Sequence, residues 1–449
     1  SKMNITRHFY INTKIIHRFY SSALFITGDK ATTNCALLTP YVDFKQYVNN
    51  FDALADNVKQ RRLDVDFHEL RRLWNLYEDL DNTKQKLDLY RINITNKIKE
   101  LKDKNIDNTN EVTKLINNGK IVRDDLKALK ECFQPIQENL VLQILHLPNV
   151  IHDLTPLDVK VITTYLEKPK KTSKHHTIIG QKLKQLNYIN ANTYYLTNEA
   201  ALMELNLLSY FNKNLDNNNF IPFCLPDFAR TAIVEGCGID YEHLDAIFTL
   251  KDPEDTKSDI SKLHLTGSAS LFAFMAYHTK LMLYPSVFPI HYYSSGRQYL
   301  PSTSISEGLF APSQSSCVHI FTATLNDKQK MEQQFFDIIT LCTDIYKALN
   351  YHFRVIYQPA FELHKSECLR VSFQMYSSHF QKYIEVGYVS MYDDYLSKRL
   401  LFTYKEGKVN VFPKVISGTV VNFAKLLGCV LESNSEQFVV PDVLCKDWN

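Results

Sequence analysis

Basic side chains gather between residues 67 and 104, and their type and spacing suit the binding of phosphate groups. The most basic stretch ends this segment, and the candidate contacts are Arg91, Lys97, Lys99, Lys102 and Lys104. Such cations on one helix would bind RNA through its phosphates, with an affinity that falls as salt rises. Acidic residues are interspersed, so an ordinary exposed face of mixed charge explains the pattern equally well. Because the formal net charge is only +2, any nucleic-acid binding must be local.

Other kinds of site have little support in the composition. Glycine accounts for only 12 residues, and the sequence contains neither a GxGxxG nor a Walker pattern. The nine cysteines form no CxxC pair, which argues against a zinc ribbon and against a secreted disulfide framework. His175 and His176 are adjacent but have no further metal ligands near them in the sequence. We therefore expect neither a metal nor a cofactor.

The element that would carry the cations is a long helical hairpin. Apolar residues recur at every seventh position in two series, Leu73, Leu80, Leu87, Ile94 and Leu101, then Leu115, Val122, Leu129 and Ile136. A strict heptad repeat keeps one stripe against a partner helix. Two such runs joined by a polar turn at 107–110 predict an antiparallel coiled coil, with a kink or break near Pro135. A purely structural or dimerising coiled coil would show the same periodicity.

The first 28 residues have the composition of a targeting segment. No acidic residue precedes Asp29, and Arg7, Lys14 and Arg18 share one side of a helical wheel. A basic, acid-free, amphipathic start predicts a mitochondrial transit peptide over 1–28 and a location in the matrix. A secretory signal is the alternative, but the apolar stretch at 23–26 is too short for one. No stretch approaches the roughly 20 apolar residues of a membrane span, so we expect no membrane partner.

The chain after the hairpin predicts a polar linker and then a mixed α+β domain. The linker covers 154–176 and ends in a basic run that is either solvated or in contact with RNA. Strands at 318–323, 354–357, 369–374, 383–388, 400–404 and 409–412 and a helix at 420–431 follow from β-branched, aromatic and apolar patterns. Strands covered by a few helices predict an antiparallel sheet and not a Rossmann domain.

Several motifs, taken in order, resemble those of seryl-tRNA synthetases, which are class II aminoacyl-tRNA synthetases. The hairpin carries the segment 90–98 and closes with Leu147-Pro148-Asn149, as in the tRNA-binding arm of that family. The expected helix, turn and strand at 199–226 are similar to motif 1, which builds the family's dimer interface. The resemblance implies an N-terminal domain with a coiled-coil arm at 29–153. It also implies a class II catalytic-type domain at 177–449, with an antiparallel sheet flanked by helices.

The resemblance also assigns candidate site residues. Lys425 falls where motif 3 has an arginine, Arg297 aligns with the arginine of motif 2, and Glu385 matches a family glutamate. These three would form a vestigial nucleotide pocket, although a buried ion-pair remnant explains them equally well. Lysine keeps the charge of arginine but lacks its planar fork.

Four further positions depart from the family in ways that would remove its chemistry. Glu307 and Ala311 replace arginines, Ser268 replaces an acid that holds serine, and His319 replaces a second glutamate. Seryl-adenylate formation builds charge on phosphate oxygens and needs fixed cations. Losing one preorganised donor commonly costs ~10²–10³ in rate, and losing several leaves little above background. We therefore expect no serine activation and no catalytic residue.

The combined features resemble a group of insect mitochondrial seryl-tRNA-synthetase-like proteins, which are paralogues without aminoacylation activity. The resemblance implies a heterodimer in which the motif 1 region stabilises the active mitochondrial seryl-tRNA synthetase. Mitochondrial RNA or tRNA, bound by the arm, would be a second partner. Two alternatives stay open, namely a divergent but active mitochondrial serine–tRNA ligase, and an interaction scaffold that binds neither RNA nor a synthetase.

Overall fold

The computed structural model of the chain describes residues 22–26, 38–44, 47, 50–103, 109–170, 174–243, 245–251, 262–302, 304 and 306–445. The chain divides into two compact units. One contains Leu80–His146, and its described helices are called the arm domain. The other joins Ala23–Asp79 to Leu147–Asn449 and is called the sheet domain. Of the predicted transit segment, only 22–26 fall within the described residues.

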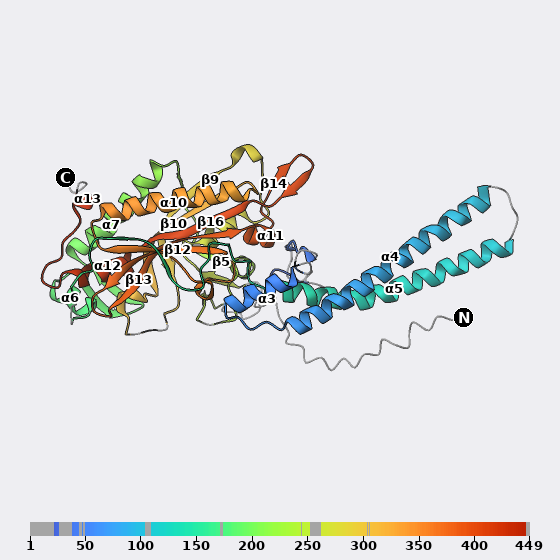
Figure 1. The fold of residues 1–449 in the computed structure, drawn as a ribbon, viewed down its shortest axis with the longest axis horizontal. Helices are drawn as coiled ribbons and strands as arrows, with labels where there is room; N and C mark the ends of the chain where they lie inside the picture. The colour runs from blue at the N-terminus through green and yellow to red at the C-terminus, as the bar shows by residue number, and fades with distance from the viewer. Residues whose placement is uncertain are drawn as a thin grey trace. The chain divides into compact units, whose positions relative to one another are not determined.

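The arm domain is built by two long helices, α4 (Phe67–Asp103), which enters the arm at Leu80, and α5 (Thr109–Leu145). Figure 1 shows the two helices side by side. Their heptad positions turn inward, so that the buried residues of the seam include Leu80, Ile94, Val122, Phe133 and Leu140. The predicted helical arm is confirmed.

Contacts between α4 and α5 run in opposite directions along the two helices, as an antiparallel pair requires. Near the distal end, a Cβ placed on Gly119 would lie 3.7 Å from Cγ2 of Ile94. Nearer the base, the Nζ atom of Lys84 lies 5.6 Å from the centre of the Phe133 ring. Lys84 is exposed, and its ammonium is close enough to the ring for a cation–π interaction. α5 continues through Pro135 as one helix, which excludes the break that was one of the two expected outcomes there.

The core of the sheet domain is an eight-stranded sheet in the order β1-β11-β12-β13-β16-β10-β9-β4. Neighbouring strands are antiparallel, except that the edge strand β4 pairs with β9 in parallel. Side chains alternate between the two faces of each strand. The strands are β1 (Lys160–Tyr165), β11 (Phe353–Tyr357), β12 (Leu369–Ser377), β13 (Lys382–Asp393), β16 (Lys414–Asn422), β10 (Gln314–Thr324), β9 (Ile290–Tyr299) and β4 (Ile221–Pro222).

Three helices pack on one face of this sheet, which is called the helix face (Figure 1). They are α7 (Asn198–Asp216), α10 (Lys328–Ala348) and α12 (Phe423–Ser433), and they share one apolar core with the strands. Buried residues of α7 recur every three or four positions, as an amphipathic helix requires. The short apolar helix α9 (Leu271–His278) packs on the other face, which is called the site face, where Phe274 stacks on Phe321 of β10.

Shorter elements surround this core. Three small sheets consist of β2 with β3, of β5, β7 and β6, and of β15, β14 and β8. Their strands are β2 (Leu186–Asn190), β3 (Thr193–Leu196), β5 (Phe228–Arg230), β6 (Phe248–Thr249), β7 (Leu263–Leu265), β8 (Met282–Leu283), β14 (Thr403–Glu406) and β15 (Val409–Val411). The remaining helices are α3 (Phe51–Gln60), α6 (His176–Lys182), α8 (Thr231–Gly236), α11 (Tyr395–Leu400), α13 (Asp442–Cys445), η3 (Pro285–Val287), η4 (Gly308–Phe310) and η5 (Ala360–Glu362).

The predicted α+β class, with an antiparallel sheet flanked by helices, is confirmed. The helix expected at 420–431 begins only at Phe423, because the three residues before it end β16, a central strand absent from the prediction. The expected linker at 154–176 contains β1 and reaches the first residue of α6. Among the described helices, none is both long and apolar enough to span a membrane.

Candidate functional site

Alternation along β9 turns Arg297 towards α7. On this strand, Tyr293 and Arg297 share the helix face, where the Tyr293 hydroxyl donates to Oδ1 of Asp216 at 2.8 Å. Nη2 of Arg297 lies 3.8 Å from Oε1 of Glu204, which is also on α7. The structure therefore does not bring Arg297 to the same side of the sheet as the network described next. Its guanidinium forms a partly exposed ion pair on the helix face.

The neighbouring positions of β9 face the other way, onto the turn before α9. The side-chain amide of Gln298 donates to Oγ1 of Thr419 at 2.7 Å and to the carbonyl of Ala269. A Cβ placed on Gly296 would lie 2.2 Å from Oγ of Ser268, so no larger side chain fits at this position while Ser268 keeps its place. Ser268 thus fills the space beside β9, and the site face carries no cation from either of these β9 positions.

His319 is at the centre of a polar network on the site face. Its Nδ1 lies 3.0 Å from Oγ1 of Thr419, and its Nε2 lies 2.9 Å from Oγ of Ser417. Ser417 donates its own proton to the carbonyl of Ile320 at 2.7 Å, so it accepts from Nε2–H, and the network fixes one neutral tautomer. Burial lowers the pKa of His319 to about 3. The two hydroxyls of β16 are therefore engaged by the chain itself.

Next to this network, aromatic side chains cover the site face along β10. The ring of His278, at the end of α9, stacks on Phe321 with centroids 4.5 Å apart. It also contacts the tilted ring of Phe402, with centroids 4.8 Å apart. Nδ1 of His278 lies 2.8 Å from the carbonyl of Phe274, and burial lowers the pKa of His278 to about 4. Phe274 in turn stacks on His319 with centroids 6.1 Å apart. An apolar helix therefore covers the site face on one side of the polar network.

Glu385 belongs to a buried charge cluster with Arg370 and Glu367. Nη2 of Arg370 lies 2.7 Å from Oε1 of Glu367, and Nη1 lies 3.5 Å from Oε1 of Glu385. Glu385 also accepts from the Ser372 hydroxyl. Burial alone would raise the pKa of Glu367, but the charge of Arg370 and a hydrogen bond from Ser390 hold it below its ordinary value. Of the two interpretations of Glu385, this geometry favours the buried ion pair.

The other predicted positions are also placed by the structure. Lys425 is in the first turn of α12, where its backbone N–H is capped by Asn422 at 3.2 Å, and it forms no ion pair with a described residue. Glu307 pairs with Lys382 at 2.7 Å, and both side chains are partly exposed. The carbonyl of Ala311 accepts from the Ser302 hydroxyl at 2.6 Å. Lys425 is thus the member of the predicted trio whose charge stays available.

His176, considered above only as a metal ligand, anchors the connection between β9 and β10 together with Glu432. Nδ1 of His176 lies 2.8 Å from Oε1 of Glu432, and Nε2 of His176 accepts from the backbone N–H of Leu309 at 2.9 Å. Both side chains are buried. Burial lowers the pKa of His176, whereas for Glu432 the hydrogen bonds from His176 and Ser377 outweigh burial and lower its pKa. The two residues are 256 positions apart, and no local signal links them.

The predicted phosphate contacts on α4 are only partly described. Arg91 pairs with Asp88 at 3.0 Å, which reduces the charge it offers to a ligand. Lys97 and Lys99 are exposed. The side chain of Lys102 and the whole of Lys104 lie outside the described residues.

A more continuous basic feature lies on α5, outside the predicted phosphate contacts. Four exposed cations follow one another at helical spacing, and they are called the α5 stripe. They form no ion pair with a described residue, although Asp124 and Glu131 lie beside them on the helical wheel. The i, i+3, i+7, i+10 spacing was the signal that could have found them. The stripe consists of Lys120, Arg123, Lys127 and Lys130.

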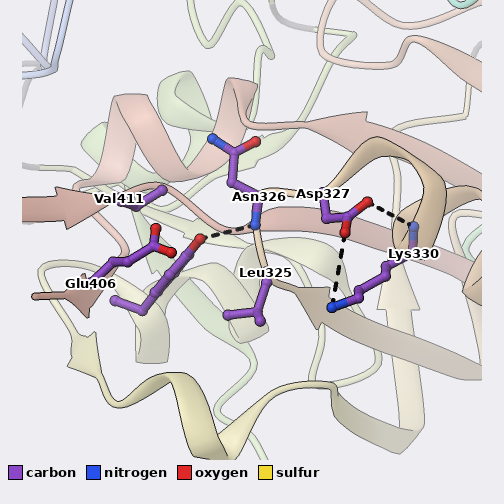
Figure 2. Close-up of a pocket in the computed structure, with 7 residues that line it drawn as sticks. Leu325, Asn326, Asp327, Lys330, Glu406 and Val411 are labelled. Carbon is purple, nitrogen blue, oxygen red and sulfur yellow. Dashed lines mark hydrogen bonds and ion pairs between the residues drawn. The ribbon is translucent and has the colours of Figure 1, made fainter.

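A separate pocket of about 300 Å³ opens where β10 meets α10 (Figure 2). Asp327 accepts from the backbone N–H of Lys330 at 3.1 Å and lies 3.9 Å from its Nζ, and the backbone N–H of Asn326 donates to the Tyr404 hydroxyl at 3.1 Å. These polar groups are directed at one another and not into the pocket. The pocket therefore offers no distinct ligand site.

The sheet with its parallel edge strand, together with the two-helix arm, defines a seryl-tRNA-synthetase-like fold of the class II type. The seryl-tRNA synthetase of Pyrococcus horikoshii, solved in complex with ATP, superposes with a TM-score of 0.76 and 17% sequence identity. The match covers 90% of this chain and 97% of that chain. At this identity the likeness shows the fold alone.

Comparison of sequences gives the family. Residues 42–151 match the seryl-tRNA synthetase N-terminal domain. The serine–tRNA synthetase-like protein Slimp of Drosophila melanogaster is 31% identical over 419 residues, covering 92% of this chain and 88% of that protein. The mitochondrial serine–tRNA ligase of Mus musculus is 26% identical over 336 residues, covering 71% and 64%. The chain belongs to the seryl-tRNA synthetase family, and its likeness to a synthetase-like protein supports a paralogue of the enzyme.

Proposed function

We propose that this chain is a mitochondrial paralogue of seryl-tRNA synthetase that does not activate serine and acts by association with the active enzyme. The observation that carries the proposal is the polar network of Gln298, His319, Ser417 and Thr419, whose members are bonded to one another. Polar groups that are already hydrogen-bonded within the chain gain little binding free energy from a hydrogen bond to a substrate. The site face is therefore arranged for stability of the free chain and not for capture of serine.

The charges beside this network lead to the same conclusion. Adenylate formation needs cations fixed on the phosphates of ATP. Arg297 is on the helix face, Ala311 is uncharged, and the pair of Glu307 with Lys382 is neutral overall. Of the two predicted cations, Arg297 and Lys425, only Lys425 forms no ion pair with a described residue. One lysine does not replace several preorganised donors, because each such donor is worth ~10²–10³ in rate.

An apolar surface on α7 and β4 supports association. Leu202 and Leu205 on α7 and Ile221 on β4 are exposed although they are large and apolar, and β4 ends the sheet. In the family resembled, this region builds the dimer interface. An exposed apolar surface at a sheet edge is stabilised when a partner covers it. We infer that this surface is where the active mitochondrial seryl-tRNA synthetase binds and is stabilised.

The basic, acid-free N-terminus and the mitochondrial ligase among the relatives support a location in the mitochondrial matrix. In that compartment the α5 stripe gives the arm a face for RNA phosphates. Because it is a row of cations without base-reading groups, its binding would follow the shape and charge of an RNA helix more than its sequence.

Two measurements test the proposal. Serine-dependent exchange of pyrophosphate into ATP should stay at background for the purified chain, with the mitochondrial seryl-tRNA synthetase as the positive control. Turnover above background would favour the divergent-ligase alternative. Affinity purification of the tagged chain from mitochondria should recover the mitochondrial synthetase in near-equal amount. Its absence from the purified material would reject the heterodimer and leave the scaffold alternative.

A further inference from the structure

Residues 23–26, inside the predicted transit peptide, are docked on the sheet domain. The backbone N–H of Ala23 donates to Oε2 of Glu235 at 2.6 Å, and the N–H of Leu24 approaches the same oxygen at 3.3 Å. Ala23 is 5% exposed and Leu24 only 1% exposed. Two successive backbone amides on one carboxylate form charge-assisted hydrogen bonds, which are stronger than neutral ones. This segment is therefore bound as part of the folded domain.

Glu235 is held in place by the packing of its helix. Glu235 lies on α8, and a Cβ added to the adjacent Gly236 would approach Cδ2 of Leu400 to 2.5 Å, so α8 and α11 are in close contact there. A second attachment follows along the chain, where the N–H of Tyr41 donates to the carbonyl of Lys398 on α11 at 3.0 Å. The chain before α3 is thus attached to the sheet domain both at Glu235 and at α11.

This docking conflicts with a transit peptide that ends at residue 28. Hydrolysis after that residue would remove both amides from Glu235 and take Leu24 out of its buried site. We propose that the processing protease hydrolyses a peptide bond before Ala23, and that Glu235 is the receptor for the segment that remains. The proposal rests on the mitochondrial targeting in the proposed function, but it makes a separate claim about where the mature chain begins.

The bond immediately before Ala23 is the latest one compatible with this geometry. Its hydrolysis consumes one water, releases the leader with a new carboxylate and leaves an ammonium on Ala23. The ammonium nitrogen would be the atom that already lies 2.6 Å from Oε2 of Glu235. Cleavage at that bond would convert a hydrogen bond into an ion pair, whereas cleavage farther upstream would keep the observed amide contacts. Cleavage after Ala23 would break the first contact.

The decisive experiment is import of the full chain into isolated mitochondria, followed by mass spectrometry of the mature N-terminus. A mature chain that begins at Ala23 or earlier supports the proposal. A chain that is imported and begins at Leu24 or later overturns it and leaves the mitochondrial assignment intact. A chain that is not imported overturns the processing site together with that assignment.

Docking is tested independently of import by limited proteolysis of the full chain with chymotrypsin, followed at the bond after Phe25. Glu235→Ala removes the acceptor of both hydrogen bonds. It should raise the rate of that cleavage by at least about tenfold, the change that the loss of even one charge-assisted hydrogen bond produces in a local opening equilibrium. Leu24→Ala should act in the same direction. Glu362→Ala, at an exposed carboxylate, is the control and should leave the rate unchanged. Equal rates for Glu235→Ala and the parent chain would overturn the docking.

Discussion

Replacing Arg370 by methionine isolates the contribution of the buried charge cluster. Methionine keeps an unbranched stem against Tyr388, whose ring centre lies 4.3 Å from the guanidinium carbon of Arg370, but it removes the charge. Glu367 is 0% exposed and would keep only neutral hydrogen-bond donors, namely the Ser390 hydroxyl at 2.7 Å and the backbone N–H of His364 at 2.9 Å. The substitution therefore leaves the buried carboxylate of Glu367 without the cation that is bonded to it. Arg61 remains near it, but its guanidinium donates to the backbone carbonyl of Glu367 and not to the carboxylate.

The magnitude follows from the burial of both partners. Breaking a buried ion pair from one side commonly costs about 3–5 kcal/mol, because the remaining charge is uncompensated. For a domain of this size, that loss corresponds to a fall in Tm of roughly 4–8 °C. The penalty should shrink as the pH falls, since Glu367 can take up a proton once its partner is gone. Adding Glu367→Gln to Arg370→Met should recover part of the loss.

Thermal unfolding followed by circular dichroism measures this effect. Lys382→Met is the matched control, because it breaks the partly exposed pair with Glu307, and such pairs contribute about 0–1 kcal/mol. Arg370→Met should melt well below this control. If both proteins melt within about 1 °C of the parent chain, the cluster is not a structural element and Glu385 would be free for another role.

Three further outcomes are expected. Because the folded-state pKa values of His319 and His278 are lowered to about 3 and about 4, the unfolded chain binds more protons below pH 6.5. Unfolding free energy should therefore fall by about 1.4 kcal/mol per pH unit for each as pH drops from 6.5 towards 4, and His278→Gln should reduce the slope in urea titrations. Leu205→Glu, at a residue 65% exposed on α7, should abolish co-purification with the mitochondrial synthetase at unchanged Tm, whereas Val409→Glu, at a residue 64% exposed, should not. Changing the α5 stripe to glutamine should lower the slope of log Kd against log salt for RNA by about 3, and Lys405→Gln should leave it unchanged.

The arm could be predicted from the sequence because its signal is local. Each apolar heptad position is one or two helical turns from the next, and the helix that it packs against follows after a short turn. The same locality explains what was missed on α5. The stripe from Lys120 to Lys130 has an equally regular spacing, but it lies outside the apolar seam from which the helices were predicted.

The site could be predicted less well, because face and register depend on pairing between distant segments. Arg297 and Gln298 are adjacent, yet the alternation of β9 sends one to Glu204 on α7 and the other to Thr419 on β16. A shift of one residue in an alignment by eye therefore reverses the predicted role. The predicted helix includes Val420 because apolar residues lie on both sides of Asn422, which is the N-cap of α12 and marks its true start.

The closure of the site face has a physical consequence that bears on function. An enzyme keeps unpaired polar groups facing its substrate, and that arrangement lowers its stability in the free state. Here Thr419 and Ser417 are bonded through His319, so the central strands gain stability without a ligand. Those strands also support β9, β4 and α7, the surface proposed for association.

The substitution His319→Glu separates this account from a simple loss of one acid. Restoring a carboxylate at this position would place it among hydroxyls in a site where His319 is 1% exposed, with no cation supplied from the neighbouring β9 positions. Its charged form would be disfavoured by burial, so the protein should melt at a lower temperature and still show no serine-dependent pyrophosphate exchange. Exchange activity in this variant would mean that the remaining groups still bind ATP and serine, contrary to the argument from the polar network.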